Sequence, residues 1–319
     1  MSKQFRSKKY WWVNCREKIF FLVFLALFLL ITPRKEGEVV VAAFPEFPLV
    51  KQEILPVPTP APYPVNITGK KPPEDVTAHA VYVVDVTSGV PIYAKNETDP
   101  VPPASTTKLM TALVALDLYK PTDIVTIHES TVDGQLMNLL SNERMTVENL
   151  LYGMLINSGN DAADALARFH PNGYGAFIAA MNEKAKSLHL SQSSFTNSVG
   201  FDEANHVMSA KDLSRIARIA MTNPLIAHIV GIPQITISDV DHTIYHQLKS
   251  TNALLGKVPG VSGIKTGYTQ EAGEALVTQV ERNNRTIIFV VLRSKDRFND
   301  TTQLIDWVFS NHQWMNYGV

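Results

Sequence analysis

The 319-residue chain contains a single cysteine, Cys15, so it cannot form an internal disulfide bond. It also lacks H-E-x-x-H and C-x-x-C patterns and its nine histidines are scattered, so neither a metal site nor a cofactor is expected. The formal net charge is −1, which gives no reason to expect nucleic acid as a partner. Charged residues make up 18% of the chain, below the average for soluble domains.

An uninterrupted apolar run, IFFLVFLALFLLI, extends from Ile19 to Ile31 behind a basic leader, residues 1–18. The run is short for a spanning helix and fits the core of a signal peptide. However, the leader is long and no A-x-A site closely follows the run, which favours an uncleaved signal anchor at residues 19–33. We therefore expect a cytoplasmic leader, a single pass through the cell membrane and an extracytoplasmic remainder, with secretion after signal cleavage as the alternative.

Residues 45–73 hold nine prolines, and those from Pro56 to Pro64 occupy alternating positions. Such a segment forms a semi-rigid, extended spacer and cannot contribute to a packed core. The sequence therefore predicts an extracytoplasmic linker at residues 34–73 and a folded domain at residues 74–319.

Strand patterns occur at both ends of this domain and helical patterns lie between them. Residues 78–85 and 90–94 predict a hairpin, and strands are also expected at 260–267, 275–279 and 286–292. Apolar spacings of three and four predict helices in the middle, for example at 105–119, 146–155 and 173–188, and a closing helix at 302–309. The order predicts an α/β (α+β) domain with one sheet built from both ends, flanked by helices, and a mostly helical subdomain.

Ser105 and Lys108 lie three positions apart at the predicted start of a helix, and so share one of its faces. A lysine that loses its charge through burial or neighbouring cations can take the proton of a hydroxyl. The helix N-terminus would also favour negative charge developing there. This spacing predicts that Ser105 is a nucleophile and Lys108 its base, but the pair alone more often marks a capped helix with a solvated lysine.

Two further segments complete a trio in a fixed order. Ser158-Gly159-Asn160 lies between two predicted helices, and Lys265-Thr266-Gly267 lies on a predicted strand. Such trios are typical of penicillin-binding proteins and class A β-lactamases, although here glycine replaces the usual aspartate of the middle motif. Together with the segments LLYGMLINSGNDAADALA, SSFTNSVGFDEANHVMSAKDLSRIARIAM and GIKTGYTQEAGEALV, the trio makes residues 74–311 resemble the D-alanyl-D-alanine carboxypeptidases, the low-molecular-mass penicillin-binding proteins of serine peptidase family S11.

The resemblance implies a serine β-lactamase/DD-peptidase-like fold with an antiparallel sheet. It also implies an enzyme that removes the terminal D-alanine of peptidoglycan stem peptides through an acyl-enzyme on Ser105, without a cofactor, and that β-lactams inhibit covalently. By the same resemblance, Lys108 would be the base and Ser158 would relay a proton to the leaving amine. Substrate binding would fall to Asn160, Lys265, Thr266, Gly267 and Tyr268, with the backbone amides of Ser105 and Tyr268 forming the oxyanion hole. Confinement of Lys108 with Lys265 in one pocket would keep Lys108 neutral.

Some points stay open at this stage. Residues 249–255, KSTNALL, lack the arginine that family members often carry there, which leaves Arg293 or Arg297 as candidates for binding the substrate carboxylate. A β-lactamase would need a Glu-x-x-Leu-Asn segment that is not evident between Asn160 and Lys265. A non-catalytic β-lactam sensor would not need Lys108, whereas an endopeptidase would use the same residues. His206 is expected to be a buried histidine that holds the loop at 194–201.

Overall fold

The computed structural model describes residues 23–24, 27, 61–128 and 132–316. The expected leader and most of the expected anchor and linker therefore lie outside the described residues. Among the residues that are described, no helix is both long enough and apolar enough to cross a membrane. Residues 61–316 belong to the structural unit Pro58–Val319, and the fold that follows is that of this unit.

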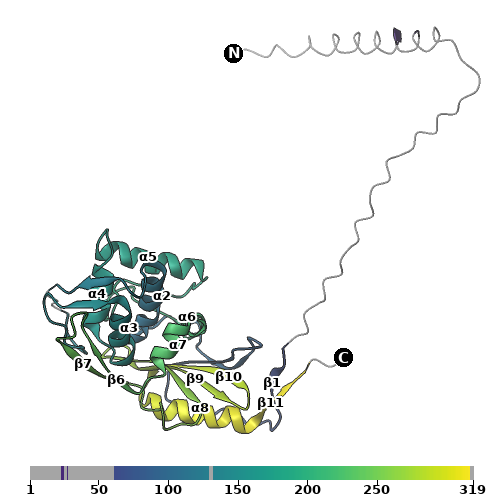
Figure 1. The fold of residues 1–319 in the computed structure, drawn as a ribbon. Helices are drawn as coiled ribbons and strands as arrows, with labels where there is room; N and C mark the ends of the chain where they lie inside the picture. The colour runs from purple at the N-terminus through teal and green to yellow at the C-terminus, as the bar shows by residue number, and fades with distance from the viewer. Residues whose placement is uncertain (1–22, 25–26, 28–60, 129–131, 317–319) are drawn as a thin grey trace, which may run out of the picture. The chain divides into compact units, whose positions relative to one another are not determined.

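A five-stranded antiparallel sheet, in the order β3-β2-β10-β9-β8, forms the centre of the unit (Figure 1). Strands β2 (Ala80–Asp85) and β3 (Pro91–Lys95) come from the start of the unit. Strands β8 (Val261–Thr269), β9 (Gly273–Arg282) and β10 (Arg285–Ser294) come from its end. The predicted sheet built from both ends of the domain is thus confirmed, and β8, which carries Lys265-Thr266-Gly267, is an edge strand.

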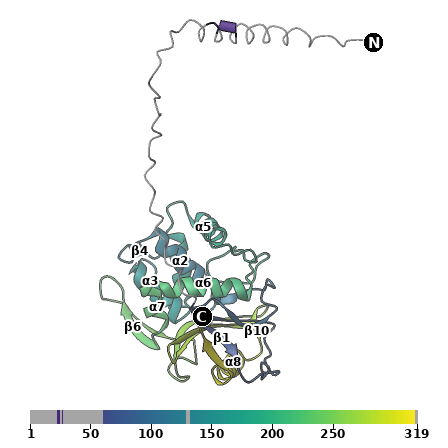
Figure 2. The ribbon, with the colours of Figure 1, turned by 90° about the vertical axis from the view of Figure 1, so that its right-hand side faces the viewer.

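Strand β10 shows why this sheet is covered on both faces. Its apolar side chains alternate, so that Ile287 and Phe289 join one core cluster while Ile288 and Val290 join the other. The first cluster includes the apolar side of helix α8 (Arg297–Asn311). The second is shared with the helical subdomain, which lies on the opposite face of the sheet (Figures 1 and 2).

The helical subdomain is built around the helix that follows Ser105. A single turn of 3₁₀ helix leads directly into this helix, whose residues from Lys108 to Ala115 are all buried. The Thr146 side chain caps the next helix by accepting a hydrogen bond from the Asn149 amide, as its position in the sequence predicts. The helical elements are η1 (Ala104–Thr107), α2 (Lys108–Leu118), α3 (Val147–Ile156), α4 (Asn160–Arg168), α5 (Tyr174–Ser187), α6 (Ala210–Thr222) and α7 (Pro224–Val230).

Three small two-stranded sheets complete the described fold. Strand β4 (Ile124–Thr126) pairs with β5 (Arg144–Thr146), and β6 (Gln234–Ser238) forms a hairpin with β7 (Tyr245–Lys249). The β6–β7 hairpin is not evident from the sequence pattern.

The third small sheet corrects one boundary. Strand β1 (Tyr63–Asn66) pairs antiparallel with β11 (His312–Met315), so the linker predicted to run to residue 73 extends too far into the domain. The prediction relied on proline content, but Pro64 is compatible with a short strand whose only neighbour is β11. The Trp314 indole nitrogen also donates a hydrogen bond of 2.7 Å to Asp85, which ties this ribbon to the end of β2.

Candidate active site

Two glycines lie close to the backbone that leads into Ser105. A Cβ on Gly267, in the edge strand β8, would lie 2.9 Å from the Cβ of Ala104 and 3.1 Å from the Ser105 nitrogen. A Cβ on Gly200, whose φ is +97°, would overlap the Ala104 carbonyl. Strand β8 and the 194–201 loop can therefore approach the nucleophile only because both positions are glycine. Ala104 itself has a φ of +49°, a left-handed conformation that is unusual for alanine.

The Lys108 amine, which is fully buried, makes three polar contacts. Its Nζ lies 2.9 Å from Ser105 Oγ, 2.7 Å from Asn160 Oδ1 and 2.9 Å from the Val199 carbonyl oxygen. The amide and carbonyl oxygens can only accept hydrogen bonds. A neutral amine would donate its two hydrogens to them, leaving its lone pair to accept the hydroxyl proton of Ser105. This arrangement is suited to proton transfer from Ser105 to Lys108.

The surroundings of Lys108 favour its neutral form. Burial is the main reason why its pKa falls well below the usual value for lysine, and the charge of Lys265 lowers the pKa further. The charge of Asp161 acts in the opposite direction and has the smallest effect of the three. Confinement with Lys265, which the sequence predicted as the cause, thus contributes less than burial.

The second lysine contacts the middle motif. Lys265 Nζ donates to Ser158 Oγ at 2.8 Å and to its neighbouring carbonyl at Thr266, 3.0 Å away. Ser158 has a φ of +61°, so the turn between α3 and α4 presents its hydroxyl from a left-handed backbone. Burial and the charge of Arg297 lower the pKa of Lys265 to about 7. The pair Ser158–Lys265 can therefore exchange a proton near neutral pH.

Asn160 occupies the first position of α4 and is 6% exposed. Its Oδ1 accepts from Lys108, and its Nδ2 donates to the Asp133 carbonyl at 2.6 Å. Because the nitrogen has this partner, the oxygen is turned toward Lys108. Asn160 therefore connects the lysine to the segment that begins at residue 133.

The outer part of the site is formed by β8. Thr266 is buried, and its hydroxyl lies 2.6 Å from the hydroxyl of Thr251. The side chain of Tyr268 is 66% exposed, one residue beyond the close contact of Gly267 with Ala104. The predicted residues thus lie together as two hydrogen-bonded groups, Ser105–Lys108–Asn160 and Ser158–Lys265, with Thr266 to Tyr268 on the adjoining strand.

The 194–201 loop supplies one residue that the sequence did not single out, and His206 holds the loop in place. Asn197 Oδ1 accepts from the amides of Val199 and Gly200 and so fixes the carbonyl that contacts Lys108. His206 donates through Nε2 to Thr107 at 2.9 Å and accepts at Nδ1 from the Thr196 amide. Its burial lowers its pKa to about 4, so the ring is neutral, and the prediction of a structural histidine holding this loop is confirmed. Backbone contacts of this kind leave no distinctive pattern in a sequence.

Of the two arginines that the sequence left open, Arg297 lies nearer the site. Its Nη1 donates to the Gly267 carbonyl at 3.1 Å, and its charge acts on Lys265. Arg293 instead donates to the Glu271 carbonyl at 3.2 Å. Thr251, within the stretch that lacks the expected arginine, is the residue that contacts Thr266.

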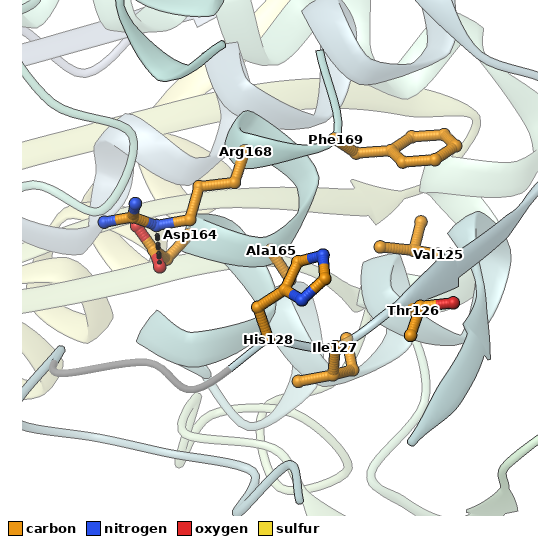
Figure 3. Close-up of a pocket in the computed structure, with 8 residues that line it drawn as sticks. All are labelled: Val125, Thr126, Ile127, His128, Asp164, Ala165, Arg168 and Phe169. Atoms are coloured by element: carbon orange, nitrogen blue, oxygen red, sulfur yellow. Dashed lines mark hydrogen bonds and ion pairs between the residues drawn. The ribbon is translucent and has the colours of Figure 1, made fainter. Parts of the chain in front are cut away.

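A separate pocket lies between β4 and α4 (Figure 3). The Arg168 and Asp164 side chains form an ion pair of 2.7 Å at its wall, and His128 lies nearby. None of the predicted site residues lines this pocket. Among the described residues, no group of three or more His, Cys, Asp or Glu side chains is arranged to hold a metal ion.

The sequence matches the D-alanyl-D-alanine carboxypeptidase family, peptidase family S11, over residues 66–296. The chain belongs to this family. It is 33% identical over 247 residues to the D-alanyl-D-alanine carboxypeptidase DacF of Bacillus subtilis, an alignment that covers 74% of this chain and 63% of that protein. The chain thus spans slightly less than two thirds of the length of that relative.

Solved structures of DD-peptidases share the fold. The Streptomyces K15 DD-transpeptidase is 30% identical with a TM-score of 0.71, and the match covers 76% of this chain and all of that one. Penicillin-binding protein D2 of Listeria monocytogenes, solved in its ampicillin-bound form, is 29% identical with a TM-score of 0.67, covering 75% of this chain and all of that one. The expected serine β-lactamase/DD-peptidase-like fold is thereby confirmed.

Proposed function

We propose that the chain is a serine-type D-Ala-D-Ala carboxypeptidase that removes the terminal D-alanine from peptidoglycan stem peptides. The observation that carries the proposal is the environment of Lys108, a buried amine whose contacts at 2.7 Å and 2.9 Å with two obligate acceptors leave its lone pair for Ser105. Family membership supports the choice of substrate class.

In the proposed reaction, Ser105 Oγ attacks the carbonyl of the penultimate D-alanine while Lys108 takes its proton. The backbone amides of Ser105 and Tyr268 stabilise the oxyanion, and removal of one such donor typically costs on the order of a hundredfold in rate. Ser158, bonded to Lys265, passes a proton to the nitrogen of the departing D-alanine. The proton that Lys108 took replaces the one that Ser158 gave away, so Lys108 is neutral again. Water then attacks the acyl carbonyl while Lys108 takes its proton, and Lys108 returns that proton to Ser105 Oγ as the shortened stem peptide leaves.

The terminal carboxylate of the substrate would be held by Lys265 and Thr266, with positive potential from Arg297. Support for this assignment comes from the contact of Arg297 with the β8 backbone and from its effect on the pKa of Lys265. β-Lactams would acylate Ser105 in the same way as the peptide and would be released slowly.

The deciding experiment combines two measurements on the purified chain and its Ser105→Ala variant. A fluorescent penicillin should label the wild type covalently and leave the variant unlabelled. A pentapeptide ending in D-Ala-D-Ala should release free D-alanine with the wild type alone. Labelling without D-alanine release would indicate a sensor, rapid turnover of the penicillin would indicate a β-lactamase, and no labelling would refute the acyl-enzyme.

We also propose that residues 19–33 anchor the enzyme in the cell membrane with its catalytic domain outside the cytoplasm. The support is the apolar run from Ile19 to Ile31 behind a basic leader. Mass spectrometry of the mature protein should find the leader still attached. A mature chain that begins near residue 44 would refute the anchor and indicate a cleaved signal.

A further inference from the structure

A segment outside the predicted motifs holds Asn160 in place. We refer to residues 133–143 as the framing segment, because its backbone makes hydrogen bonds with Asn160 and Asp161 at the start of α4. The Asn160 amide nitrogen of the backbone donates to the Gln135 carbonyl at 2.7 Å, and its side-chain nitrogen donates to the Asp133 carbonyl at 2.6 Å. The second contact decides which end of the side-chain amide faces Lys108.

The next residue of α4, Asp161, is also hydrogen-bonded to the framing segment. Asp161, which is 5% exposed, accepts hydrogen bonds of 3.0 Å from the amides of Met137 and Leu139. One carboxylate thus binds two backbone amides of the framing segment. The position of Asn160 therefore depends on where residues 133–139 lie.

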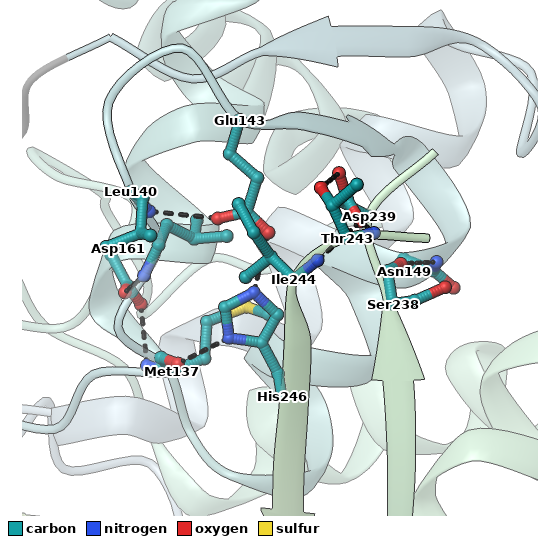
Figure 4. Close-up of polar contacts among 11 residues, drawn as sticks. Met137, Leu140, Glu143, Asn149, Asp161, Ser238, Asp239, Thr243, Ile244 and His246 are labelled. Carbon is teal, nitrogen blue, oxygen red and sulfur yellow. Dashed lines mark hydrogen bonds and ion pairs between the residues drawn. The ribbon is translucent and has the colours of Figure 1, made fainter. Parts of the chain in front are cut away.

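The framing segment is in turn fixed by a buried ion pair (Figure 4). His246, on β7, directs Nδ1 to the Met137 carbonyl at 3.0 Å and Nε2 to Glu143 Oε1 at 2.6 Å. The Met137 carbonyl can only accept a hydrogen bond, so Nδ1 is the donor in that contact. The other carboxylate oxygen accepts from the Leu140 amide at 2.9 Å. The His246 and Glu143 side chains are 4% and 0% exposed.

Stability alone is a poor explanation for this pair. Two buried charges lose their hydration, and apolar residues of similar size often stabilise a protein as well or better. The pair does supply directional contacts to both Met137 and Leu140 of the framing segment, which an apolar pair would lack. It also joins this segment to the β6–β7 hairpin, which contains none of the predicted site residues.

We propose that His246 and Glu143 are positioning residues, whose ion pair holds the framing segment against β7 and thereby keeps the Asn160 oxygen on the Lys108 amine. This inference rests on the proposed function, because its effect is read in the acylation of Ser105. Loss of the pair allows Asn160 to shift, and a displacement of about 1 Å in a reacting constellation can cost on the order of a hundredfold in rate. The pair acts on the rate of acylation rather than on initial drug binding.

The test is a double-mutant cycle between Glu143→Gln and Asn160→Ala, with the acylation rate constant for a fluorescent penicillin as the readout. Alone, Glu143→Gln should lower the acylation rate constant at least tenfold. The penicillin concentration that gives half of the maximal rate should stay unchanged. In the Asn160→Ala background, the same change should alter the rate less than twofold, because the group through which the pair acts is gone. A merely structural role would give the same factor in both backgrounds and would overturn the proposal.

Two further variants guard against a loss of folding. The paired change His246→Leu with Glu143→Leu leaves no unpaired buried charge, and it should also acylate at least tenfold more slowly. A wild-type rate in this variant would overturn the proposal. Arg144→Ala is the matched control, because it breaks an exposed 3.1 Å contact with Asp241 near the same hairpin and should change the rate less than twofold. Wild-type labelling in the same assay separates failure of this inference from failure of the proposed function.

Discussion

Replacement of Asn160 by aspartate places a negative charge against the proposed base with little change in shape. The amide oxygen lies 2.7 Å from Lys108 Nζ in a buried setting. At an effective dielectric constant of about 20, a full charge at that distance favours the ammonium form by roughly 6 kcal/mol. This corresponds to a change of roughly ten-thousandfold in the protonation equilibrium of Lys108. Even if relaxation removes half of this energy, the effect is about a hundredfold.

The sign follows from the role of Lys108 as a base. Aspartate raises the pKa of Lys108, so the neutral amine becomes rarer at neutral pH and the rising limb of the acylation rate moves to higher pH. We expect Asn160→Asp to acylate at least a hundredfold more slowly than the wild type at pH 7 and to recover partly at alkaline pH.

The assay is the time course of fluorescent penicillin labelling from pH 6 to pH 10, with thermal unfolding measured in parallel. Asn160→Ser is the uncharged control, because it loses the donor to the Asp133 carbonyl, as aspartate does, and shortens the side chain without adding charge beside Lys108. Its rate should fall without a shift of the pH profile. If the two variants show the same profile, the charge state of Lys108 does not control acylation and the reasoning is refuted.

Three further predictions concern the surroundings of the site. Arg297→Gln removes a cation that lowers the pKa of Lys265, so Lys265 should stay protonated to higher pH and the alkaline limb of D-alanine release should move upward; an unchanged profile would contradict this. Gly200→Ala would place a Cβ on a backbone with a φ of +97°, where it overlaps the Ala104 carbonyl. This variant should lower the labelling rate, and in urea titrations it should lower the free energy of unfolding by about 2 kcal/mol or more. Gly175→Ala is the control, because its added Cβ has no heavy atom within 4 Å, and it should change neither quantity. Asp300 accepts from the Thr77 and Ala78 amides through its two different oxygens, and Asp300→Asn turns one of these acceptors into a donor. This change should lower the free energy of unfolding by about 1–3 kcal/mol in the same titration without changing the pH profile of labelling.

The elements that could be predicted are those whose periodicity reflects burial. Strand β10 is a continuous apolar run because both of its faces are covered, and the run signals a strand directly. Strand β1 was missed because its pairing with β11 depends on a residue about 250 positions away, while its local sequence is dominated by prolines. The β6–β7 hairpin was missed for a related reason, since its alternation of apolar and polar residues is weak and one of its inward positions is the polar His246.

The site residues also fall into those that the sequence could predict and those that it could not. Ser105, Lys108, Ser158 and Lys265 stand in short motifs, so their side chains could be named from the sequence. Their partners act through backbone atoms, such as the Val199 carbonyl, which any residue type could supply. The contribution of burial to the pKa of Lys108 was likewise hidden, because the sequence does not reveal that the whole of α2 near this residue is enclosed.

Donor counting alone does not determine the charge on Lys108, since an ammonium group could also donate to all three of its neighbours. Burial favours the neutral form, and none of those neighbours carries a negative charge that would oppose it: they are a hydroxyl, an amide oxygen and a backbone carbonyl. Asp161, the carboxylate whose charge raises the pKa of Lys108, is engaged instead by two amides of the framing segment. The framing segment therefore has two effects on the base, since it turns the neutral oxygen of Asn160 toward Lys108 and holds the adjacent carboxylate in a different set of contacts. If the framing segment moved, Asp161 would be free to contact Lys108, and its negative charge would favour the ammonium form that burial disfavours. Displacement of this segment should therefore affect proton transfer before it affects folding.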